Sequence, residues 1–391
     1  MPDLAEFAQA RLLERNVVSR AFFAREAGRL AGVCQEMSER FLKGGRLLAF
    51  GRGPYATDAQ HVSVEFVHPV IVGKRALPAL DLSVAFSPWL RTLLRPEDMV
   101  MGFGPPQGDA EVAAALEGAH SQGAMTFALP GKGGNYAVEA PSTDPFIHQE
   151  LIEILYHTLW ETVHVFFEHR ERGHDVGASG FLYPFLGESK QDTGGVLAEV
   201  TASIGEKARE VERLREQVAA GASRPMAEAA LAIGERLGAG GKLIAFGNGG
   251  SATDANDLTL DCVTPPAGMT PIPAISLAME SPNISAIAND IGAEAIFSRQ
   301  LIAQARSADV AVALSTSGGS KNIVMALEEA RKRGLMTVAL LGYDGGEVVR
   351  RKLADVALIV PSDYIPRIQE VQASLYHVLR QALEETPRGG A

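Results

Sequence analysis

The sequence predicts an α/β protein built from two similar halves, each with a parallel sheet flanked by helices. Short apolar runs alternate with helical patterns along the whole chain, which is typical of parallel sheets covered on both faces. Residues 46–58 (RLLAFGRGPYATD) match residues 242–254 (KLIAFGNGGSATD). Residues 149–157 (QELIEILYH) match residues 369–377 (QEVQASLYH) in the same way. These matches predict an internal repeat.

The remaining strands also occur in pairs. The run DMVMGF at 98–103 corresponds to DVAVAL at 309–314, and MTFAL at 125–129 corresponds to MTVAL at 336–340. Glycines and turn-forming residues concentrate between the halves, so we expect a linker there. The predicted organisation is a first domain at 1–167, a linker at 168–193 and a second domain at 194–391.

Composition excludes several classes of function. A net charge of −11 argues against nonspecific DNA or RNA binding, which requires a positive footprint. Cys34 and Cys262 are the two cysteines and form no CxxC, which is typical of a reducing compartment. The N-terminus lacks the build of a signal peptide, and no apolar run is as long as a membrane span. We therefore expect a cytoplasmic protein with neither a nucleic acid nor a membrane as partner.

Two glycine-rich turns in the second half predict a phosphate site. The first follows the strand at 242–247 and opens a helix, so free N–H groups and the positive end of the helix dipole coincide. The second follows the strand at 309–314 and adds hydroxyl donors. Ordinary glycine caps and hydroxyl N-caps are the alternative. The predicted phosphate-binding residues are Asn248, Gly249, Gly250, Ser251, Ser315, Thr316, Ser317 and Ser320.

Five segments of the second half together closely resemble the sugar isomerase (SIS) domain of bacterial phosphoheptose isomerases. They are GNGGSATDA, SAIANDIGAEAIF at 285–297, STSGGSKN, LLGYDGG at 340–346 and RIQEV at 367–371. The first half shares the resemblance through the repeat. The resemblance implies two tandem SIS domains, each with a parallel five-stranded flavodoxin-like sheet flanked by helices. Family members are usually single-domain chains that form tetramers, so it also implies a homodimer with four such domains.

The resemblance further implies conversion of sedoheptulose 7-phosphate to glycero-manno-heptose 7-phosphate through an enediol. The family binds zinc with a His, a Glu, a Gln and a second His, of which the Glu and the second His are the proposed acid and base. The matching metal positions in the first half are His61, Glu65, Gln149 and His157, with Glu65 and His157 catalytic. Without this context, a His and a Glu four residues apart favour an ordinary helix-surface contact.

The second half differs at the metal positions, where it has Asp257, Asp261, Gln369 and His377. We interpret this set as vestigial, with an oxygen-rich site of weaker metal affinity as the alternative. Asn289 and Asp290 match a substrate-contacting segment of the family, although a loop Asx-turn is also compatible with them.

The phosphate loop is lost in the first half, where GPPQGD at 104–109 replaces STSGGS. Prolines remove N–H donors there, and Asp109 repels a phosphate. We therefore expect composite sites with one zinc each, in which the second half binds phosphate and the first half, from the same or a neighbouring chain, supplies the metal set. The rival hypothesis is a noncatalytic SIS protein that senses a sugar phosphate or docks on a protein. The loop suits six- and seven-carbon sugar phosphates alike, from lipopolysaccharide or other glycan pathways.

Overall fold

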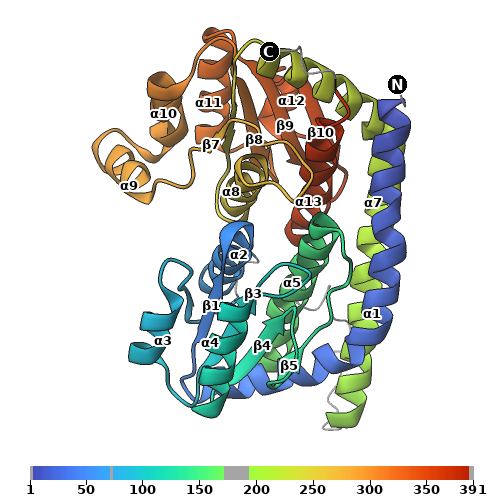
Figure 1. Cartoon of the computed structure of the whole chain (residues 1–391), viewed down its shortest axis with the longest axis vertical. Helices are drawn as coiled ribbons and strands as arrows, with labels where there is room; N and C mark the ends of the chain where they lie inside the picture. The colour runs from blue at the N-terminus through green and yellow to red at the C-terminus, as the bar shows by residue number, and fades with distance from the viewer. Residues whose placement is uncertain (1–2, 71–73, 171–192, 387–391) are drawn as a thin grey trace. The chain divides into compact units, whose positions relative to one another are not determined.

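The computed structural model describes residues 3–70, 74–170 and 193–386. Contacts divide the chain into two compact units (Figure 1). The N-terminal unit is Val17–Glu210, and the C-terminal unit is Met1–Asn16 with Val211–Ala391. The long helices α1 (Leu4–Leu42) and α7 (Thr193–Gly238) each contribute residues to both units. The predicted domain limits at 167 and 194 stay predictions, because most of the predicted linker lies outside the described residues.

The N-terminal unit contains a parallel five-stranded sheet in the order β2-β1-β3-β4-β5. This order is that of a flavodoxin-like sheet, as expected. Strands β1, β3 and β4 are buried along their whole length, which explains their continuous apolar sequences. The strands are β1 (Leu47–Gly51), β2 (Ala79–Asp81), β3 (Met99–Phe103), β4 (Met125–Leu129) and β5 (Tyr136–Ala137).

Helices cover this sheet on both faces (Figure 1). Leu90 of α3 and Leu116 of α4 pack with Leu48 and Val100 of the central strands in one hydrophobic core. Helices α2 and α5 pack against each other and carry the predicted metal residues. The elements are η1 (Gly53–Tyr55), α2 (Ala56–Val67), α3 (Phe86–Leu93), α4 (Ala110–Ser121) and α5 (Pro145–Arg170).

The C-terminal unit has a second parallel sheet in the order β10-β9-β8-β6-β7, the same topology as the first. The predicted pair of five-stranded sheets is thus confirmed. The strands are β6 (Leu243–Phe246), β7 (Ala274–Ser276), β8 (Val310–Ser315), β9 (Met336–Gly342) and β10 (Val356–Val360). The helices are α8 (Gly250–Val263), α9 (Ser281–Asp290), η3 (Ala293–Ala295), α10 (Ile296–Gln304), α11 (Lys321–Lys332), α12 (Gly346–Arg350) and α13 (Ile365–Ala382).

One buried ion pair recurs at the same place in both units. Asp98 Oδ2 lies 2.7 Å from Arg46 Nη2, and Asp309 Oδ2 lies 2.7 Å from Lys242 Nζ. In each pair, the other carboxylate oxygen accepts the backbone N–H of the basic residue at 3.0 Å. Asp309 therefore precedes β8 instead of opening it, which shifts this strand by one residue from its predicted start.

Within the described ranges, no helix is both long enough and apolar enough to cross a membrane.

Candidate active site

The first predicted phosphate turn connects β6 to α8. Gly249 adopts a φ of 57°, a conformation that favours glycine, and α8 begins at the next residue. No side chain caps this helix, so the first N–H groups of α8 remain available as donors. Ser251 lies in the first turn and is buried. The sequence folds this way because Gly249 allows the backbone to turn into α8 shortly after the buried strand β6 ends at Phe246.

The second predicted turn connects β8 to α11. The Ser315 hydroxyl accepts the N–H of Gly318 at 3.1 Å, and the Ser317 hydroxyl accepts the N–H of Gly319 at 3.2 Å. The turn is held by the next loop, because Thr316 O accepts the N–H of Gly342 at 2.9 Å. Hydroxyl and amide groups therefore line the turn in a fixed arrangement.

A pair of asparagines joins the two turns. Asn248 Nδ2 donates to Asn322 Oδ1 at 3.0 Å, and Asn322 Nδ2 donates to Asn248 Oδ1 at 2.8 Å. The carboxyl ends of the adjacent strands β6 and β8 thus present two helix N-termini side by side. This arrangement suits a phosphate ester, since both termini carry partial positive charge.

Asn289 and Asp290 form the exposed C-terminal end of α9 rather than a loop Asx-turn. Asn289 Nδ2 donates to Asp290 Oδ1 at 2.8 Å. Among the hydrogen bonds of the described residues, none links these two side chains to the phosphate turns.

The N-terminal unit fills the corresponding anion position with its own carboxylate. Asp109 caps α4, and its Oδ1 accepts the N–H groups of Glu111 and Val112 at 2.9 and 3.0 Å. Its Oδ2 lies 3.2 Å from Arg52 Nη1. Asp109 was predicted to repel a phosphate, and the geometry adds that it occupies the helix N–H groups a phosphate would need. Pro54 is the second residue of η1 and removes a further donor.

The predicted metal set of this unit comes together on α2 and α5. His61 Nε2 lies 3.3 Å from His157 Nε2 and 3.8 Å from Glu65 Oε1. These three ligand atoms lie within 4.8 Å of one another, and all three residues are buried. Gln149 is buried nearby on α5, and its Nε2 donates to Thr57 Oγ1 and to an Asp58 carboxylate oxygen, each at 3.2 Å.

This donor set fits a zinc ion. Zinc takes imidazole nitrogens and carboxylate oxygens at about 2.0–2.2 Å, so neighbouring ligands of a tetrahedral site are about 3.4 Å apart. The separations of 3.3 and 3.8 Å around His61 Nε2 are close to that value. Gln149 would add its side-chain oxygen.

The matching set of the C-terminal unit is also assembled, on α8 and α13. His377 Nε2 lies 3.1 Å from Asp261 Oδ2 and 3.4 Å from Asp257 Oδ2. Burial, and then the charge of Asp257, raise the pKa of Asp261 well above the usual carboxyl range, while His377 lowers it. Gln369 is buried on α13. The predicted vestige thus keeps a compact cluster of acids around an imidazole.

Sequence reasoning missed the role of the tyrosines beside these histidines. Tyr376 Oη donates to Asp257 Oδ2 at 2.8 Å. In the N-terminal unit, the ring of Tyr156 lies 5.5 Å from that of His61 and 5.2 Å from that of His157. The signal was present in the sequence, because both copies of the repeat end in the tripeptide Leu-Tyr-His.

Comparison with known proteins gives matches in both sequence and fold. A profile of the SIS domain matches residues 208–342. The phosphoheptose isomerase of Sulfurimonas denitrificans is 44% identical over 145 residues, which are 37% of this chain and 73% of that protein. The phosphoheptose isomerase of Pelobacter propionicus is 42% identical over 161 residues, which are 41% of this chain and 84% of that protein.

Two solved structures resemble nearly the whole chain. The C-terminal domain of glucosamine-fructose-6-phosphate aminotransferase from Francisella tularensis covers 97% of this chain, with 95% of its own length, a TM-score of 0.56 and 11% identity. A putative tagatose-6-phosphate ketose/aldose isomerase from Clostridium novyi covers 98%, with 93% of its own length, the same TM-score of 0.56 and 11% identity. At this identity the likeness shows the fold alone, and it extends over both sheets.

Proposed function

The chain belongs to the phosphoheptose isomerase family of SIS-domain proteins, and from this premise we propose that it is a sugar-phosphate aldose–ketose isomerase. The proposed reaction converts sedoheptulose 7-phosphate to glycero-manno-heptose 7-phosphate through an enediol. In this proposal, the phosphate turns of the C-terminal unit bind the phosphate. The four-residue metal set of the N-terminal unit supplies the metal site and the acid–base pair.

The observation that carries this proposal is the pair of joined turns in the C-terminal unit. The predicted phosphate-binding residues lie at two helix N-termini. They include a run of hydroxyls and no carboxylate, which suits a phosphate ester. Asn248 and Asn322 fix the two turns relative to each other through paired amide hydrogen bonds. The two turns together form what we call the phosphate seat. Its donors are in place before a ligand binds, which lowers the entropic cost of binding.

The chemistry of the proposal is proton transfer between neighbouring carbons. The proton on carbon 1 of the ketose must leave, and a proton must reach carbon 2, while charge develops on the two oxygens. We assign Glu65 and His157 as the acid–base pair, since a carboxylate and an imidazole exchange protons readily near neutral pH. A zinc ion held by His61, Glu65, Gln149 and His157 would stabilise the developing oxygen charge as a Lewis acid.

The C-terminal unit has an acidic cluster of Asp257, Asp261 and His377 that corresponds to the metal set of the N-terminal unit. Asp257 and Asp261 are shorter acids at the positions where the family has a His and a Glu, and Tyr376 hydrogen-bonds to Asp257. We propose that this set does not carry the reaction. An Asp261→Asn variant tests this assignment, because it should keep most of the turnover of the native chain.

Zinc content and isomerisation of sedoheptulose 7-phosphate, measured on the same preparations, test the proposal. The native chain is compared with His61→Ala, His157→Ala and Ser317→Ala. We expect turnover to fall in all three variants and zinc to fall in the two histidine variants alone. A native chain that binds the sugar phosphate but neither holds zinc nor turns it over would contradict the proposal and favour the sensor or docking role.

We further propose that the chain acts as a cytoplasmic homodimer. Cys34 and Cys262 are buried and are not joined in a disulfide, which supports a reducing compartment. Family members with one domain form tetramers, so a dimer of this chain would contain the same number of domains. Light scattering should give a mass twice the 41.5 kDa of one chain, and a mass of one chain would contradict the proposed dimer.

A further inference from the structure

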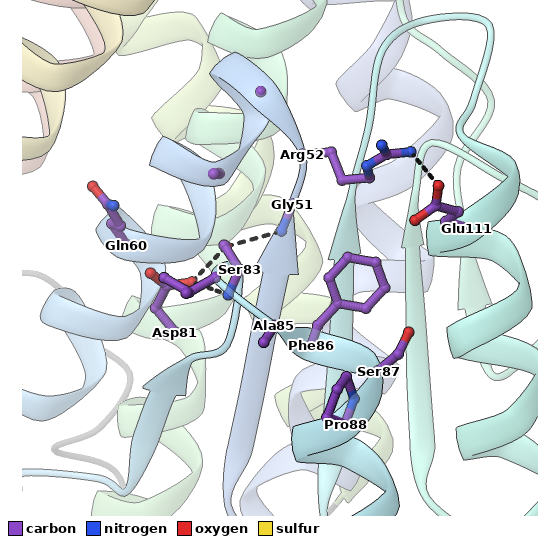
Figure 2. A pocket seen from close by; sticks show the side chains of 13 residues that line it. Gly51, Arg52, Gln60, Asp81, Ser83, Ala85, Phe86, Ser87, Pro88 and Glu111 are labelled. Atoms are coloured by element: carbon purple, nitrogen blue, oxygen red, sulfur yellow. Dashed lines mark hydrogen bonds and ion pairs between the residues drawn. The ribbon is translucent and has the colours of Figure 1, made fainter.

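A cavity of about 520 Å³ lies in the N-terminal unit, at the carboxyl ends of β1 and β2 (Figure 2). Strand β1 has β2 on one side and β3 on the other, so the strand order reverses at β1. Ligands bind at such reversal points in open parallel sheets. The volume is within the range of small-molecule sites. The described residues that line it include none of the four proposed metal ligands, so the proposed reaction does not account for it.

One wall of the cavity carries a fixed carboxylate. The Ser83 hydroxyl accepts the N–H of Gly51 at 3.1 Å and donates to Asp81 Oδ1 at 2.5 Å. The backbone N–H of Ser83 donates to the same oxygen at 2.9 Å. These contacts orient the Asp81 carboxyl and use one of its oxygens. The other oxygen is available to accept a hydrogen bond from a ligand.

The charges around the cavity disfavour a phosphate. Arg52 is the one basic residue among those that line it, and its guanidinium lies 3.0 Å from Glu111 and 3.2 Å from Asp109. Asp109 and Glu111 thus pair with this arginine, and Asp81 adds a further carboxylate on the opposite side of the cavity. Because Asp109 also occupies the N–H groups of α4, neither the helix terminus nor the arginine remains for an anion.

We propose that this cavity binds a neutral polyhydroxylated ligand of the chemical class of unphosphorylated sugars. Figure 2 shows Asp81 and Gln60 on one side, Arg52 and Glu111 on the other, and the ring of Phe86 between them. Carboxylates accept hydrogen bonds from sugar hydroxyls. Phe86 is buried and its ring stacks on that of Phe50 with the centroids 4.5 Å apart, so it adds an apolar part to the wall. The unit thus has a ligand site distinct in chemistry from the phosphate seat.

Saturation-transfer NMR on the full chain tests this site with D-glucose, D-mannose, D-galactose and sedoheptulose at millimolar concentration. We expect transfer to at least one of these sugars. Asp81→Asn keeps the Ser83 contacts but removes the charge, and it should weaken binding roughly tenfold, as expected for losing a charge-assisted hydrogen bond. Ser87→Trp should abolish transfer by filling the cavity from the start of α3.

Two control variants identify where the sugar binds. Ser121→Trp adds the same bulk on the exposed end of α4, outside the cavity, and should leave transfer unchanged. Ser317→Ala alters the phosphate seat of the other unit and should also leave it unchanged. The proposal is overturned if the native chain gives no transfer to any of the four sugars, if Ser87→Trp retains it, or if Ser317→Ala loses it. Since Ser317→Ala separately reports on sugar-phosphate turnover, failure here is distinct from failure of the proposed isomerase.

Discussion

Substituting Gly318 with alanine should damage the phosphate seat selectively. Gly318 has a φ of +59°, and a Cβ at this position would come 2.2 Å from Gly345 O and 2.7 Å from Gly345 C. Both are backbone atoms, so no side-chain rotation relieves the contact. The Gly318 N–H also donates to Ser315 Oγ at 3.1 Å, so displacement of the turn weakens this bond.

The size of the effect follows from two contributions. An alanine in the left-handed region costs about 1–2 kcal/mol. The backbone clash must in addition move the turn away from the loop after β9, which misplaces the N–H donors of the seat. Losing one hydrogen bond to a charged phosphate costs about 1.5–3 kcal/mol, so the dissociation constant for the sugar phosphate should rise about 10- to 100-fold.

Two neighbouring glycines provide matched controls. At Gly319 an added Cβ would meet its nearest atoms at 3.8 and 3.9 Å, so Gly319→Ala should bind within about twofold of the native chain. At Gly249, with φ +57° and nothing within 4 Å, Gly249→Ala adds backbone strain without a clash and should fall between the two. Calorimetric titration with sedoheptulose 7-phosphate measures the series. Equal affinities of Gly318→Ala and Gly319→Ala would refute the reasoning.

Three further predictions concern buried groups. Burial lowers the pKa of His148, which bonds to Gly104 O, from 6.5 to about 4. The neutral imidazole therefore stabilises the fold above the unfolded pKa, and this stabilisation is lost as pH falls towards the folded pKa. Between about pH 7.5 and about pH 5 the native chain should lose about 2 kcal/mol more unfolding free energy than His148→Gln, and equal losses in denaturant titrations would contradict this. Burial raises the pKa of Cys34 to about 12, so mass spectrometry should find it unlabelled by iodoacetamide in the folded chain, and rapid labelling would be inconsistent with this. A double-mutant cycle of Asn248→Ala and Asn322→Ala should give a coupling of about 1 kcal/mol in sugar-phosphate binding, and additivity would mean that the pair does not join the turns.

The fold was predictable because its signals are local. Strands such as β1 and β6 are continuous apolar runs, and glycines mark the turns that follow them. Because the sequence repeats, the strands and helices expected in one half could also be expected in the other. The clustering of His61 with His157 was expected from the resemblance to the family's metal set, and helix spacing accounts for His61 and Glu65 sharing one face.

Interactions between side chains from distant segments were not predictable in this way. The Asn248–Asn322 pair depends on how closely two adjacent strands bring their following helices. Asp109 was identified as unfavourable for phosphate, but its capping of α4 depends on rotamer and loop geometry. The cavity beside Asp81 arises from the packing of α3, which periodicity alone does not specify.

The most direct test of the account is deuterium incorporation from D₂O during incubation with sedoheptulose 7-phosphate, followed by NMR. In the proposed route, carbon 2 receives its proton from a protein acid, which can exchange with solvent before the transfer. We expect the native chain to form glycero-manno-heptose 7-phosphate with deuterium at carbon 2, and His157→Ala and Ser317→Ala to form little or none. Binding of the sugar phosphate by the native chain without product or exchange would contradict the central claim that this protein is an isomerase.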